Sequence, residues 1–180
     1  MMSKKLLSLL VFGVLITALV AALKLVNWVP SALQEGALRK YGSIDEVKAK
    51  LKITDVFAPA YYPQCFSWPP SQIAAQTRPY TAVVMEFNRK DSREACLIIS
   101  QVASPHVLPE EKIKLTRVAE SVRYQLRGRD ALLEVGVCEE NIMCSRISWN
   151  EKGYRISVAM KSAPVDLIRI AESMTARPGK

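Results

Sequence analysis

An N-terminal apolar stretch constrains this chain more than any other feature of its sequence. Leu6 to Val29 carries a single charged residue, Lys24, and as a helix it spans roughly 36 Å. That length crosses a hydrocarbon layer of ~30 Å with some tilt, and Pro30 ends the helix. The sequence therefore predicts a transmembrane signal anchor over residues 1–30. A cleaved signal peptide, with Val20-Ala21-Ala22 at its cleavage site, is the alternative.

Charge indicates which side of the membrane holds the rest of the chain. Lys4 and Lys5 precede the apolar stretch, which is typical of a signal anchor whose amino terminus stays in the cytoplasm. We therefore expect a single-pass membrane protein with its C-terminal domain outside the cytoplasm. Of the net charge of +8, residues 1–30 supply +3, which leaves a mild +5 for the rest of the chain. That balance and that location argue against nucleic acid as a partner.

Small residues recur along one face of the apolar stretch. Gly13, Thr17 and Ala21 lie four residues apart and would let a second helix approach closely. They are helix-packing candidates for a membrane-protein partner or a homodimer. The alternative is a face that contacts only the lipid bilayer.

Helix-capping motifs indicate where the segments of the chain beyond this stretch begin and end. Two capping boxes occur, the second of them Ser43 to Glu46, and each predicts the first turn of a helix. Gly42, between the two, suits a helix C-terminus. We expect a stalk helix over residues 31–42, an extracytoplasmic domain over 43–175 and a short tail over 176–180.

A proline-rich segment over residues 57–79 holds half of the ten prolines together with several aromatic side chains. Proline fixes φ and donates no backbone hydrogen bond, so we expect an irregular extended wrap and no strand in the interior of a sheet. Tyr61, Tyr62 and Trp68 have two interpretations. They line a groove that binds a peptide, lipid or glycan or, as we favour, they cover the edge of the core.

Strand patterns dominate the remainder. The expected elements are a hairpin of residues 80–87 and 95–102, a helix over 109–119, strands over 122–127, 131–138, 143–149 and 154–160, and turns at 128–130 and 150–153. Behind Pro164, helical spacing of apolar residues predicts a closing amphipathic helix that packs on the sheet: Leu167, Ile170, Ala171 and Met174. The fold class is therefore α+β, an antiparallel meander sheet packed by a few helices with one face left to solvent.

The four cysteines include no C-x-x-C pair, so neither thioredoxin-like exchange nor ribbon-type zinc binding is supported. Cys138 and Cys144 fall on the polar side of adjacent strands with turn residues between them, so we expect a cross-strand disulfide. Cys65 and Cys96 are a second disulfide candidate, which depends on how the wrap lies.

Residues for catalysis or cofactor binding are hard to assemble. The single histidine, His106, lies between prolines with no nucleophile motif nearby, and the seven glycines form no phosphate loop. We predict no enzymatic activity, no metal site and no cofactor. A serine hydrolase that uses His106 is a remote alternative.

Three arginines give the outer domain a further candidate surface. Arg123, Arg127 and Arg129 share odd parity on or beside one strand and predict a basic ridge for anionic headgroups or an acidic partner. A plain solvated strand face is the alternative.

Four segments resemble an uncharacterised bacterial extracytoplasmic domain family: Val56–Pro63, Leu97–Gln101, Ile147–Tyr154 and Asp166–Met174. The family occurs outside the membrane on single-pass proteins, including anti-sigma-factor-like ones. The resemblance implies the fold and a bacterial inner-membrane location with the domain in the periplasm or outside the cell, and it supplies no catalytic residues. With only about five residues before the apolar stretch, we expect no cytoplasmic part able to hold a sigma factor.

These features predict a membrane-anchored extracytoplasmic binding or sensing domain without catalytic activity. Its expected contacts are the bilayer and a membrane-protein partner. The alternative is an accessory structural subunit of an inner-membrane protein complex, docked through the small residues of the apolar stretch.

Overall fold

The computed structural model describes residues 13–19, 24, 38–91, 93–106 and 112–175. Backbone contacts divide the chain into two compact units, 1–37 and Leu38–Lys180. Residues 13–19 are helical, and within the described ranges no helix is long and apolar enough to cross a membrane. Most of the predicted span, Leu6 to Val29, lies outside those ranges.

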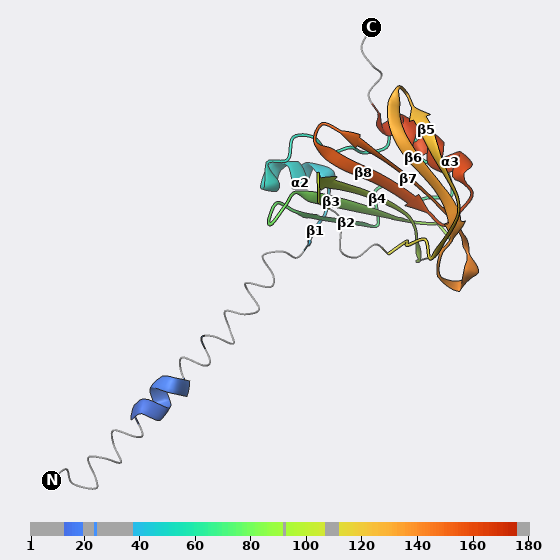
Figure 1. Ribbon diagram of the computed structural model, residues 1–180. Helices are drawn as coiled ribbons and strands as arrows, with labels where there is room; N and C mark the ends of the chain where they lie inside the picture. The colour runs from blue at the N-terminus through green and yellow to red at the C-terminus, as the bar shows by residue number, and fades with distance from the viewer. Residues whose placement is uncertain (1–12, 20–23, 25–37, 92, 107–111, 176–180) are drawn as a thin grey trace, which may run out of the picture. The chain divides into compact units, whose positions relative to one another are not determined.

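The second unit is an α+β domain built on one antiparallel sheet of eight strands (Figure 1). The strand order is β1-β2-β3-β4-β8-β7-β6-β5. Two meanders, β1 to β4 and β5 to β8, are joined where β4 pairs with β8. The predicted antiparallel α+β architecture is confirmed. The strands are β1 (Arg39–Tyr41), β2 (Gln72–Gln76), β3 (Ala82–Asn88), β4 (Ala95–Ala103), β5 (Arg117–Leu126), β6 (Arg129–Val137), β7 (Met143–Glu151) and β8 (Tyr154–Met160).

One face of the sheet, the helix face, packs against the helices α2 (Ile44–Leu51) and α3 (Pro164–Met174) and against the wrap. Ile156, Val158 and Met160 of β8 are at most 2% exposed on this face, and Leu167 and Ile170 of α3 are fully buried against the same core. The alternation of apolar residues therefore predicted β8 correctly, and their helical spacing predicted α3 correctly. The opposite side of the sheet is the open face.

The capping box of α2 forms as predicted. Ser43 Oγ accepts a hydrogen bond from the Glu46 backbone N–H at 3.1 Å, and Glu46 Oε2 accepts one from the Gly42 N–H at 2.6 Å. Gly42 does not end a helix, because Arg39–Tyr41 just before it form β1 and pair with β2. The predicted stalk helix is therefore wrong at its C-terminal end, and the compact domain begins at Leu38.

The wrap is irregular as predicted over 57–71, but β2 lies within its bounds, between β1 and β3. The prediction of no interior strand is wrong because the prolines flank residues 72–76 and leave every N–H of that strand able to donate. The start of the wrap is fixed by Gln101 of β4, a fully buried side chain. Its Nε2 donates to the Asp55 carbonyl at 2.6 Å, and its Oε1 accepts from the Phe57 N–H at 3.1 Å.

The helix predicted over 109–119 is wrong in its described part. Residues 112–116 are irregular, and Arg117 already begins β5. Gly136 on β6 permits this pairing, because a Cβ added there would lie 2.1 Å from the Arg117 carbonyl oxygen. A bulge between Val118 and Glu120 accompanies the close approach.

Two of the three connections in the second meander are two-residue turns. Arg127 and Gly128, with φ of 48° and 80°, connect β5 to β6, one residue before the predicted turn. Lys152 and Gly153, with φ of 49° and 80°, connect β7 to β8 within the predicted turn. Both central residues of such a turn need positive φ, which glycine adopts without steric cost.

The open face is not wholly solvated, so that prediction is wrong in part. A second apolar cluster covers it, in which Ile113 is 1% exposed. Ile113 belongs to the segment that was expected to be helical. The cluster combines Val84, Ile98, Ile113, Cys138, Cys144 and Ala159 with the partly buried Leu38 and Leu115.

Candidate functional site

The open face gathers side chains from five strands that are spread over residues 39–160 of the sequence. Directly paired residues of an antiparallel sheet share a face. The register pairs Lys40 with Ala74, Ala74 with Val84, Val84 with Ser100 and Ser100 with Ser157. These residues therefore form one row across β1, β2, β3, β4 and β8.

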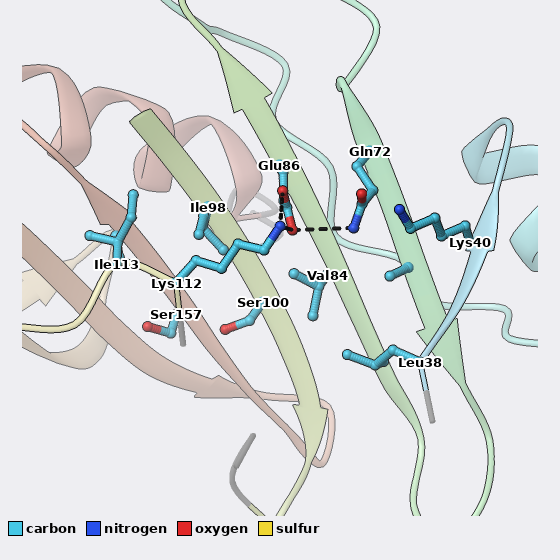
Figure 2. A pocket seen from close by; sticks show the side chains of 12 residues that line it. Leu38, Lys40, Gln72, Val84, Glu86, Ile98, Ser100, Lys112, Ile113 and Ser157 are labelled. Atoms are coloured by element: carbon cyan, nitrogen blue, oxygen red, sulfur yellow. Dashed lines mark hydrogen bonds and ion pairs between the residues drawn. The ribbon is translucent and has the colours of Figure 1, made fainter. Parts of the chain in front are cut away.

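This row runs through a pocket of about 190 Å³ (Figure 2). Small and branched apolar side chains on neighbouring strands form its floor, and Leu38 and Ile113 come from segments that border the sheet. Polar groups lie around this floor, so the pocket combines apolar surface with a few charged and hydroxyl groups, as small-molecule sites do. The lining residues are Leu38, Lys40, Gln72, Ala74, Val84, Glu86, Ile98, Ser100, Lys112, Ile113, Ser157 and Ala159.

A buried carboxylate marks one end of the pocket. The Glu86 side chain is 10% exposed, and Lys112 Nζ lies 2.8 Å from both of its oxygens. Gln72 Nε2 donates to Glu86 Oε1 at 3.3 Å, and Figure 2 shows both partners converging on the carboxylate. Burial of an ionised carboxylate is costly unless it is paired and hydrogen-bonded, and these two partners supply both.

The remaining polar groups of the pocket are Lys40, Ser100 and Ser157. Within the described residues, none of the three makes an ion pair or a side-chain hydrogen bond. His106 is not among the lining residues; it is exposed and stacks on Tyr80 with ring centroids 4.5 Å apart. The pocket therefore presents one ammonium group and two hydroxyl groups to a ligand, and His106 lies outside it.

A wider, shallower concavity of about 570 Å³ occupies the other end of the open face. Arg123 and Arg155 line it together with Asp130, whose Oδ1 accepts a hydrogen bond from Gln125. Its lining also includes Ser104, Pro105, Ala131, Leu132, Ser148, Trp149 and Asn150.

The predicted basic ridge does not form. Arg129 pairs with Leu126 across the β5–β6 turn and so lies on the helix face, where its guanidinium is 2.8 Å from Glu151 Oε1. Arg123 lies on the open face, and Arg127 lies in the turn itself. A two-residue turn pairs residues of opposite parity, so odd positions before and after it face opposite ways.

The aromatic candidates divide between two sites. Tyr61 donates its backbone N–H to Ser173 Oγ of α3 at 3.1 Å and lies under the Arg169 guanidinium, 4.6 Å from the ring centroid. Tyr62 and Trp68 stack with centroids 5.2 Å apart. Tyr61 packs against the core, which agrees with the favoured covering role, and a binding role for the three stays a prediction.

The predicted Cys138–Cys144 disulfide is confirmed, with Cα atoms 5.8 Å apart. Both cysteines are buried in the open-face cluster rather than on a polar surface. The pairing of Cys65 with Cys96 is wrong: Cys65 is exposed, Cys96 is buried on β4, and both are free thiols. Burial, followed by the nearby Glu94 carboxylate, raises the pKa of the Cys96 thiol.

The helix-packing candidates fall in the first unit. Gly13 and Thr17 lie one turn apart on the helical residues 13–19, and Thr17 Oγ1 donates to the Gly13 carbonyl at 2.6 Å. A Cβ at Gly13 would meet nothing within 4 Å. Ala21 lies outside the described residues.

Sequence reasoning missed the pocket residues Lys40, Glu86 and Lys112. The alternation of Val84 with Glu86 and of Ile98 with Ser100 was a signal that polar groups share a face with the sheet's small apolar patch. Their convergence also required the strand order, which local patterns do not contain.

In the part of the chain that is described, no three His, Cys, Asp or Glu side chains are placed to hold a metal ion. Comparison of the chain with protein-family models, with curated proteins and with solved structures finds no match.

Proposed function

We propose that the protein is a non-catalytic binding domain, held outside the cytoplasm by its N-terminal segment, and that the open-face pocket is its binding site. The pocket is the observation that carries the proposal. It offers apolar floor residues, a carboxylate satisfied by Lys112 and Gln72, and further polar groups that have no side-chain partner among the described residues. A few placed polar groups around an apolar floor are the usual composition of a small-molecule site.

The disulfide supports the location. Cys138 and Cys144 form a disulfide. Disulfides persist in oxidising compartments and are rare in the cytosol, where thiols are kept reduced.

Exposed Cys65 provides a test of the location. In intact spheroplasts, a membrane-impermeant maleimide should label Cys65, and a Cys65→Ser variant should lose the label. Mass spectrometry without reductant should recover a linked Cys138–Cys144 peptide. Labelling of Cys65 only after lysis, with four free thiols, would contradict the extracytoplasmic location.

Binding is tested by following methyl NMR signals of the full-length chain while a fragment set of anions, cations and neutral compounds is added. We expect at least one fragment to shift the signals of Val84 and Ile98. Val84→Phe fills the pocket and should abolish the shifts, whereas Val165→Phe is the matched control, because Val165 is 69% exposed on α3. No shift with any fragment would contradict a binding function for this pocket.

An accessory subunit of an inner-membrane complex is the second candidate, favoured by the small residues Gly13 and Thr17, which lie one turn apart on the helical residues 13–19. Its test is co-purification of membrane partners by Gly13→Leu and Thr17→Leu variants. Loss of a partner from both variants supports the subunit role, and unchanged co-purification removes its physical basis.

A further inference from the structure

We infer that the open-face pocket takes a small organic acid, with an apolar body about the size of one aromatic ring and one carboxylate. The inference rests on the proposed function and names its ligand class. It follows from the size of the pocket, the composition of its floor and the charge of its lining residues.

Size limits the apolar body. The pocket encloses about 190 Å³, and an apolar cavity of about 150 Å³ is known to hold benzene. One ring with a small substituent therefore fits. The floor beneath it is apolar, since Ala74, Val84, Ile98 and Ala159 all face this side of the sheet.

Charge selects the polar group. The lining contains two lysines and one glutamate, which gives a net charge of +1. Glu86 is already bonded to Lys112 at 2.8 Å and to Gln72 at 3.3 Å, so it offers little to a ligand cation. Lys40 has no ion-pair partner within the described residues. An anion beside Lys40 gains a charge-assisted contact, while a cation meets two ammonium groups.

The position of Lys40 agrees with this assignment. It lies on β1 in register with Ala74 of the pocket floor, and Figure 2 shows its side chain directed towards Gln72, which itself bonds Glu86. A ligand ring seated over Ala74 and Val84 can therefore place its carboxylate at the Lys40 ammonium without displacing the Glu86–Lys112 pair.

The test compares benzoate, benzyl alcohol and benzylammonium, which share a ring and differ in charge. Each is titrated into the full-length chain while the methyl NMR signals of Val84 and Ile98 are followed. We expect benzoate to bind most tightly and benzylammonium least. Lys40→Gln should weaken benzoate about fivefold, the upper range for an exposed ion pair, and leave the affinity for benzyl alcohol unchanged. Lys48→Gln, an exposed lysine of α2, is the matched control and should change neither.

The outcomes separate the ligand class from the function. Equal binding of the three probes, tighter binding of benzylammonium, or equal weakening of benzoate and benzyl alcohol by Lys40→Gln overturns the organic-acid assignment and leaves the binding function standing. Failure of all three probes to shift the pocket signals overturns the assignment. The binding function fails as well only if the wider fragment set is also silent.

Discussion

Replacement of Gln101 by leucine tests how the start of the wrap is held to the sheet. Gln101 is fully buried on β4 between Val83 and Ile156, and its amide bonds the Asp55 carbonyl and the Phe57 N–H. Leucine matches the shape roughly but leaves both backbone groups without that partner. Each buried unsatisfied group costs about 1–3 kcal/mol. Asp55 and Phe57 are half-buried, so we expect a loss near the low end of the sum, about 3 kcal/mol.

The assay is urea unfolding of the full-length chain, combined with hydrogen exchange at the Phe57 amide. The unfolding free energy should fall by about 3 kcal/mol, and the amide should exchange faster. Gln125→Leu is the control, because Gln125 is exposed and its loss should change stability by no more than about 0.5 kcal/mol. If Gln101→Leu behaves like Gln125→Leu and the Phe57 amide stays protected, the two hydrogen bonds do not hold the wrap.

Three further perturbations have defined outcomes. Gly136→Ala forces a Cβ against the β5 backbone and should cost about 2 kcal/mol in urea unfolding; an unchanged midpoint would show that β5 does not pack so closely. Replacing Cys138 and Cys144 by serine opens a loop with a sequence separation of 6 and should cost roughly 2–3 kcal/mol. That double variant should also lose any response of its unfolding midpoint to reductant, and a persisting response would point to another bond. Hydrogen bonding to Lys50 chiefly lowers the pKa of Glu46 in the folded state, so its stabilisation is present above the unfolded pKa and is lost as pH falls through the folded one. Glu46→Gln should therefore melt lower than wild type at neutral pH and equally in acid, and an equal gap at both pH values would contradict this origin.

Local sequence patterns correctly predicted the elements whose structure depends on residues close together in the sequence. The alternation of Tyr154 to Met160 predicted β8, helical spacing after Pro164 predicted α3, and Ser43 with Glu46 predicted the start of α2. In each case the hydrogen bonds or the apolar face follow from residues within a few positions of each other.

The misplaced elements depend on partners far away in the sequence. β1 exists because Arg39–Tyr41 pair with β2, and the start of β5 forms because Gly136 lets Arg117 approach β6. Capping and proline rules predict the structure of single segments, and here pairing with distant strands determined the structure instead.

The candidate site also depends on pairing between strands, which local sequence patterns do not contain. Lys40 and Ser157 lie in the same row of the open face only because of the register of five strands, which no local motif encodes. The arginine prediction failed for a related reason, because parity was carried through a turn that reverses it at Arg127. Residue types and their alternation within a strand were visible in the sequence, and the order of the strands was not.

The central claim, that the open-face pocket binds a small organic acid, is tested most directly by intermolecular nuclear Overhauser effects between benzoate and the methyl-labelled full-length chain. We expect contacts from the ring protons to the methyl groups of Val84, Ile98 and Ala159, which line the pocket. Contacts to helix-face methyl groups such as Leu167 and Ile170 instead, or none to the pocket at a benzoate concentration that saturates the protein, would contradict the claim.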